Sequence, residues 1–112
     1  MEIVLRIGAS ESPLEEVEAL WLESTIRKTC FDAFGRPWDR EAAAALHVAD
    51  VLEEALARRS SPEPIEVGRP AALGLLNVFH DKDADDVFAH VARSEGVAAL
   101  YLTLRRFVHD GG

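Results

Sequence analysis

Cysteine is scarce in this sequence: Cys30 is the only one, so an internal disulfide is excluded. Small secreted domains depend on several disulfides, whereas a lone thiol is typical of a reducing compartment. Cys30 lies among apolar residues in a helical pattern, and no histidine stands in a motif that would place a base beside it. We therefore expect a buried core thiol in a cytoplasmic protein, rather than a catalytic nucleophile.

Long apolar segments are missing as well. No stretch approaches the ~20 consecutive apolar residues of a membrane-spanning helix. The opening segment MEIVLRIG has neither the basic start nor the apolar run of a signal peptide. Both observations favour a protein that stays in the cytoplasm and does not enter a membrane.

Basic residues are outnumbered, with 12 Lys and Arg against 20 Asp and Glu, and the formal net charge is −8. A chain this acidic is repelled by phosphate backbones and anionic lipid headgroups, so we expect neither nucleic acid nor a membrane surface as partner. A basic protein is the partner that this charge favours. Arginine far exceeds lysine and alanine is abundant, which indicates a GC-rich bacterial genome.

Sequence motifs for catalysis or cofactor binding are absent too. The internal glycines stand apart from one another, and the sequence contains no GxGxxG, P-loop, GxSxG or HExxH pattern. We therefore expect no bound cofactor and favour a protein that is not an enzyme.

What the sequence does contain fits one small globular domain. Its 112 residues, 48% of them hydrophobic, suffice for a single core, so we predict one helical domain over residues 1–112. Apolar residues recur at helical spacing over most of this length. The predicted helices cover residues 13–34, 39–59, 70–79, 83–95 and 97–108.

The first of these helices has a clear predicted beginning but an irregular apolar face. Ser12 is the expected N-cap, and Pro13 suits the first helical position. The apolar residues change sides near Glu23, which indicates either a break or two sets of neighbours. The helix over residues 39–59 is more regular, and its alanine-rich stripe predicts the close approach of another helix.

Two short segments predict strands. Residues 2–7 alternate with a period of two, residues 8–13 are rich in turn formers, and residues 65–67 alternate briefly. If both segments are strands, they either pair with each other or leave an edge open to a partner strand or a second copy. The predicted fold is mainly α: a compact bundle of five or six helices with one short two-stranded β element, in the order β-α-α-β-α-α-α.

The most conspicuous acidic segment covers residues 80–86. Three of its aspartates match the first ligand positions of a calcium loop, but Asp86 replaces the required glycine and Ala92 replaces the final glutamate. We interpret the run as the N-cap and first turn of a helix, where acids suit the helix dipole. The matching positions are Asp81, Asp83 and Asp85.

A second candidate for chemistry lies on the helix over residues 39–59. His47, Asp50 and Glu54 are spaced i, i+3 and i+7, so they share a polar face that could present a metal ion or an acid–base pair. The same spacing is typical of any solvated helix face, which is the interpretation we favour. Glu54 and Arg58 are also spaced for an ordinary i, i+4 ion pair.

The function that the sequence favours is a cytoplasmic protein-interaction module with an acidic surface: an adaptor, an immunity-type inhibitor or a small subunit of a larger assembly. Tryptophan and arginine are over-represented where interfaces gain most of their binding energy. The predicted partner-binding residues are Arg36, Trp38 and Arg40 in one segment and Glu15, Glu16 and Glu18 in another.

Two alternatives remain. One is a small metal-binding protein or enzyme that uses surface His, Asp and Glu residues. The other is a self-associating structural protein, a homo-oligomer that pairs through the strand over residues 2–7.

The calcium-loop interpretation can be tested directly. Calorimetric titration with calcium and with magnesium should give no binding heat, because the loop lacks its glycine and its bidentate glutamate. A saturable heat with either cation would contradict this expectation and favour the metal-binding alternative.

Overall fold

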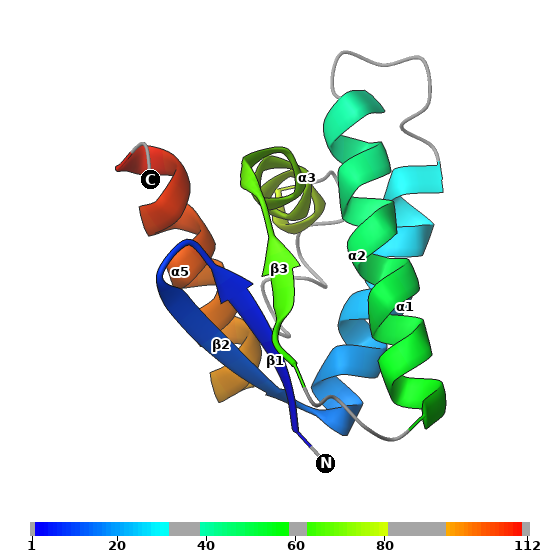
Figure 1. Cartoon of the computed structure of the whole chain (residues 1–112). Coiled ribbons are helices and arrows are strands. Elements are labelled where there is room, and N and C mark those ends of the chain that lie inside the picture. The colour runs from blue at the N-terminus through cyan, green and yellow to red at the C-terminus, as the bar shows by residue number, and fades with distance from the viewer. Residues whose placement is uncertain (1, 32–38, 59–62, 81–93, 111–112) are drawn as a thin grey trace.

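The structure is a computed structural model that describes residues 2–31, 39–58, 63–80 and 94–110. The fold of these residues is mainly helical α/β, with four helices instead of the predicted five or six and three strands instead of two. Of the helix predicted over residues 83–95, residues 83–93 lie outside the described residues, and Glu95 is the first residue of α5. In chain order the elements are β1 (Glu2–Ile7), β2 (Ser10–Glu15), α1 (Glu16–Phe31), α2 (Asp39–Arg58), β3 (Ile65–Val67), α3 (Arg69–Phe79) and α5 (Glu95–His109), as Figure 1 shows.

The sheet has the strand order β2-β1-β3, with β1 in the centre. β1 and β2 form an antiparallel hairpin around Gly8, whose φ of 61° is a left-handed conformation that glycine adopts without strain. β3 lies parallel to β1, with Leu5 beside Ile65 and Ile7 beside Val67. Residues 2–7 and 65–67 thus pair with each other, which is one of the two alternatives that the sequence left open.

β2 replaces the turn and helix start predicted for this part of the chain. Ser12 is a buried strand residue, not an N-cap, and Leu14 points into the core opposite Ile3. Pro13 misled the prediction because proline opens many helices, but it is also tolerated on an edge strand that does not need its N–H. α1 consequently begins at Glu16.

α1 buries a single continuous face, so the predicted change of sides is wrong. Ala19, Leu22, Ile26 and Cys30 are fully buried and follow one another at spacings of three or four residues. The apolar residues before Glu23 do not form a buried face of this helix. Leu14 belongs to β2, and the side chains of Val17 and Leu20 are exposed. The expectation that Cys30 is buried is confirmed.

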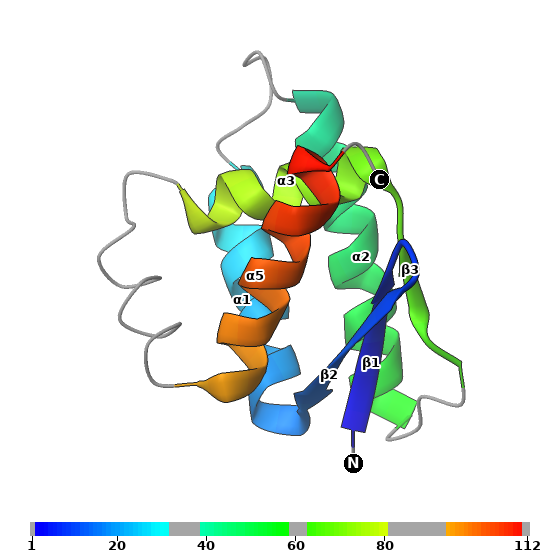
Figure 2. The ribbon, with the colours of Figure 1, turned by 90° about the vertical axis from the view of Figure 1, so that its left-hand side faces the viewer.

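The four described helices lie on one face of the sheet, and none of them covers the other face, which we call the open face (Figures 1 and 2). The inward residues of β1, namely Ile3, Leu5 and Ile7, are fully buried against the helices, while the intervening positions are not. α2 and α5 match their predicted ranges to within two residues, and α3 to within one. Among the described helices, none combines the length and the apolarity that crossing a membrane requires.

α2 and α3 pack closely, as the alanine-rich stripe predicted. Gly74 of α3 is buried against α2, and a Cβ atom there would overlap the carbonyl oxygen of Glu41 and lie 3.0 Å from the Cβ of Ala45. Glycine is therefore required at this helix crossing because no side chain fits.

Substitution at this crossing should lower stability. We expect Gly74→Ala to reduce the free energy of unfolding by about 1–3 kcal/mol, because overpacking outweighs the better helix propensity of alanine. The matched control is Gly68→Ala, where φ is −78° and the nearest atom to a new Cβ is 3.9 Å away. Urea denaturation measures both variants, and a Gly74→Ala protein as stable as the control would contradict the close packing.

Candidate functional site

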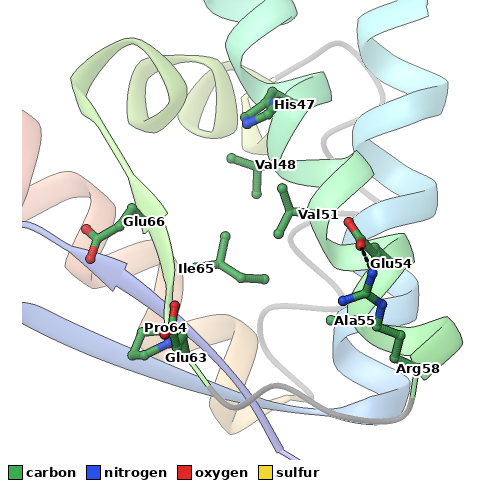
Figure 3. Close-up of a pocket in the computed structure, with 10 residues that line it drawn as sticks. All are labelled: His47, Val48, Val51, Glu54, Ala55, Arg58, Glu63, Pro64, Ile65 and Glu66. Carbon is green, nitrogen blue, oxygen red and sulfur yellow. Dashed lines mark ion pairs between the residues drawn. The ribbon is translucent and has the colours of Figure 1, made fainter.

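A groove lies between α2 and β3 and has a volume of about 380 Å³ (Figure 3). We call it the α2–β3 groove. A volume of this size falls within the range of ordinary ligand sites, about 300–1,000 Å³. The groove is lined by His47, Val48, Val51, Glu54, Ala55, Arg58, Glu63, Pro64, Ile65 and Glu66.

The floor of the groove is apolar. Val48, Val51 and Ala55 lie on one side of α2 because they are spaced i, i+3 and i+7. Ile65 comes from β3, and in Figure 3 its side chain points toward Val51 across the groove. Val48 and Ile65 are almost fully buried, whereas Val51 and Ala55 are half-buried and remain accessible from the groove.

The rim of the groove is acidic. Three glutamates, Glu54, Glu63 and Glu66, belong to the lining with one arginine, Arg58. Arg58 and Glu54 form the predicted i, i+4 ion pair, with 2.6 Å between the guanidinium nitrogen and the carboxylate oxygen. Because the side chain of Glu66 points out of the groove, two carboxylates, those of Glu54 and Glu63, stand at the rim with one guanidinium, which leaves a negative formal charge and favours a basic ligand.

Glu66 belongs to the lining through its main chain. In Figure 3 its side chain points away from α2 and out of the groove. Its carboxylate lies 3.0 Å from the guanidinium of Arg6, which also lies 3.1 Å from Glu11. Hydrogen bonds from Arg6 to Glu11 and Glu66 raise the pKa of the Arg6 guanidinium above its ordinary value. This three-residue ladder crosses all three strands on the open face of the sheet.

The predicted group of His47, Asp50 and Glu54 is divided in the structure. His47 and Glu54 line the groove, but Asp50 points toward α1 and accepts a hydrogen bond of 3.0 Å from Arg27. Arg27 also binds Glu53 and Glu23, at 2.6 and 3.1 Å, and so joins α1 to α2. Within residues 2–31, 39–58, 63–80 and 94–110, no group of three or more His, Cys, Asp or Glu residues could hold a metal ion.

The predicted partner-binding residues lie in two separate places. Glu15 and Glu16 are exposed where β2 joins α1, beside the exposed side chain of Val17. Arg40 is exposed in the first turn of α2, and the starts of α1 and α2 lie at opposite ends of this helix pair (Figure 1). Arg36 and Trp38 lie outside the described residues, and so does the acidic run Asp81–Asp86.

Glu18 has an internal role that the sequence did not reveal. Its carboxylate accepts hydrogen bonds from the Ser94 hydroxyl, from the Gly96 N–H at 3.0 Å and from the Glu15 N–H at 2.9 Å. Ser94 is itself the N-cap of α5, where its hydroxyl accepts from the Val97 N–H at 3.3 Å. The carboxylate therefore joins the beginning of α1 to the beginning of α5, where the helix dipole favours a negative charge.

The charge of Glu18 is stabilised by this arrangement. Burial raises the pKa of its carboxyl, but the hydrogen bonds from Ser94 and from the backbone outweigh burial and hold the pKa below its ordinary value. A carboxyl with a lowered pKa contributes stability above its unfolded pKa, and this contribution is lost as the pH falls through the lowered value.

Glu18→Gln should accordingly reduce stability in a pH-dependent way. At pH 7 we expect a loss of about 1 kcal/mol, because hydrogen bonds to a charged acceptor are stronger than those to an amide. The difference from the wild type should shrink as the pH falls below about 4.3, the ordinary value for glutamate. Exposed Glu16 provides the control, and Glu16→Gln should stay within about 0.5 kcal/mol of the wild type throughout. Thermal denaturation at several pH values measures both, and equal losses would refute the role of Glu18.

The groove residues on its β side were not among the predicted site residues. Both sides of the groove had been predicted as elements, because Val48 and Ala55 belong to the apolar stripe of the helix over residues 39–59 and residues 65–67 were a predicted strand. The sequence did not show that this helix and this strand lie next to each other. Comparison of the chain with protein-family models, with curated proteins and with solved structures gives no match.

Proposed function

We propose that this chain is a cytoplasmic protein-interaction module that binds a basic segment of a partner protein in the α2–β3 groove. The observation that carries the proposal is the combination of an apolar floor and an acidic rim in one hollow. An apolar side chain of the partner gains binding energy by leaving water at Val51 and Ala55. Basic residues beside it meet the carboxylates of the rim, which orients the partner and speeds association.

The overall charge of the chain supports the same partner. With a formal net charge of −8, the protein attracts basic proteins at long range and repels acidic ones. The exposed acids Glu15 and Glu16 lie on another part of the surface, where they add to this field. An adaptor, an immunity-type inhibitor and a small subunit all fit these properties.

The two alternative functions have weaker support. A metal-binding or catalytic use of His47 and Glu54 must compete with the ion pair between Glu54 and Arg58. Self-association through the N-terminal strand does not fit the sheet, because β1 pairs on both sides within the chain. Among the described residues the edges of the sheet belong to β2 and β3, so this alternative has less support.

The proposal is tested by blocking the groove floor. Val51→Lys places a charged side chain on the floor, and we expect it to abolish capture of the partner from an extract of the source organism. Ala57→Lys is the matched control, because Ala57 is exposed on the same helix and does not line the groove. Both variants add the same charge, so only the position differs.

The comparison is made by tagged pull-down at low and at high salt, with the captured proteins quantified. The wild type and Ala57→Lys should retain the partner equally, and high salt should weaken capture because it screens the rim charges. A thermal melt verifies that Val51→Lys is folded. Equal capture by folded Val51→Lys and by the control would refute the groove as the binding site.

A further inference from the structure

The strand edge that runs beside the groove determines how a partner segment can bind there. β3 is the last strand in the order β2-β1-β3, so among the described residues it pairs with β1 alone. The face of β3 that carries Ile65 is turned toward α2 across the groove, as Figure 3 shows, so the other edge of β3 runs beside the groove. An edge strand presents backbone N–H and C=O groups that can pair with an added strand.

The lining of the groove includes the strand beside this edge. Pro64, Ile65 and Glu66 contribute to it in succession, and the side chain of Glu66 points elsewhere. The surface that Glu66 offers to the groove is therefore main chain. Main-chain groups at a sheet edge, with side-chain pockets beside them, are the two requirements for recognition by strand addition.

We propose that the partner segment binds in the α2–β3 groove as an extended strand that pairs with β3 and adds a fourth strand to the sheet. The inference rests on the function proposed above and specifies its mode of binding. β3 spans three residues, about 10 Å of extended chain. The paired part of the partner therefore covers about three residues, and neighbouring residues contact the rim.

The two faces of the sheet determine which side chains the segment carries. Ile65 and Val67 point to the helical side, whereas Glu66 points to the open side. An added strand alternates in the same way, so every second side chain faces Val51 and Ala55 and is apolar. The intervening side chains lie beside Glu66, where two carboxylates share the single guanidinium of Arg6, and are basic. The preferred segment alternates apolar and basic residues.

The probe is a blocked heptapeptide that alternates lysine and valine, with lysine at both ends. The control peptide has the same composition and charge but holds its three valines together in the middle. We expect the alternating peptide to bind the wild-type protein at least tenfold more tightly, measured by fluorescence anisotropy. Amide NMR shifts should locate its binding at residues 65–67 and along α2.

Backbone methylation of the peptide tests the pairing itself. In a strand, the N–H groups of residues on one face point to the same edge. One peptide is therefore N-methylated at its valines and a second at its internal lysines, with unchanged side chains. One of the two should bind about tenfold more weakly than the parent, and the other should bind like the parent.

Each outcome decides the question. Strand pairing is refuted if both methylated peptides and the control peptide bind like the parent, or if none of the peptides binds. In either case, loss of partner capture by Val51→Lys would still support the proposed function. If Val51→Lys leaves capture unchanged, both proposals fail, whatever the peptides do. A dimer of the protein that the peptide dissociates, observed by sedimentation, would also overturn the inference, because a second copy would then be the occupant.

Discussion

The parallel pairing of β1 with β3 is the contact on which the groove depends. It joins Leu5 to Ile65 and Ile7 to Val67, residues that are far apart in the sequence. Because β1 takes β3 on one side and β2 on the other, β3 becomes an edge strand, and its face with Ile65 is turned toward α2. Without this pairing, Ile65 would not be held opposite Val51, and neither the apolar floor nor the strand edge beside it would exist. The site is thus a consequence of sheet order, not of any sequence motif.

Sequence patterns predicted the elements better than their arrangement. The periodicity of α2 and α5 predicted both helices to within two residues, because over a long segment the helical spacing accounts for more apolar residues than a strand-like alternation does. The prediction for residues 10–15 was wrong because Ser12 and Pro13 suit the start of a helix and an edge strand equally well. Only the pairing of Leu14 with Ile3 decides between them, and a pairing between segments is not a local signal.

The candidate site shows the same limit at the level of single residues. Glu54 and Arg58 were predicted as an ion pair from their spacing, and they form one. Asp50, predicted to share a face with His47, is instead held by Arg27 of α1, a contact that depends on how two helices lie together. Glu18 was interpreted as a surface acid because its partners, Ser94 and Gly96, follow it by more than 70 residues. A side chain that contacts a distant segment leaves no periodic pattern in the sequence from which the contact could be predicted.

The ion pairs of the described residues explain why the surface stays acidic after folding. Arg6 contacts two carboxylates and Arg27 contacts three, so each arginine neutralises only part of the charge around it. Exposed pairs of this kind contribute little to stability, about 0–1 kcal/mol each. Their larger consequence is to fix carboxylates in position while leaving a net negative field on the sheet and along α2. A basic partner of the kind proposed above would meet charges that are already oriented, and it would not have to order them when it binds.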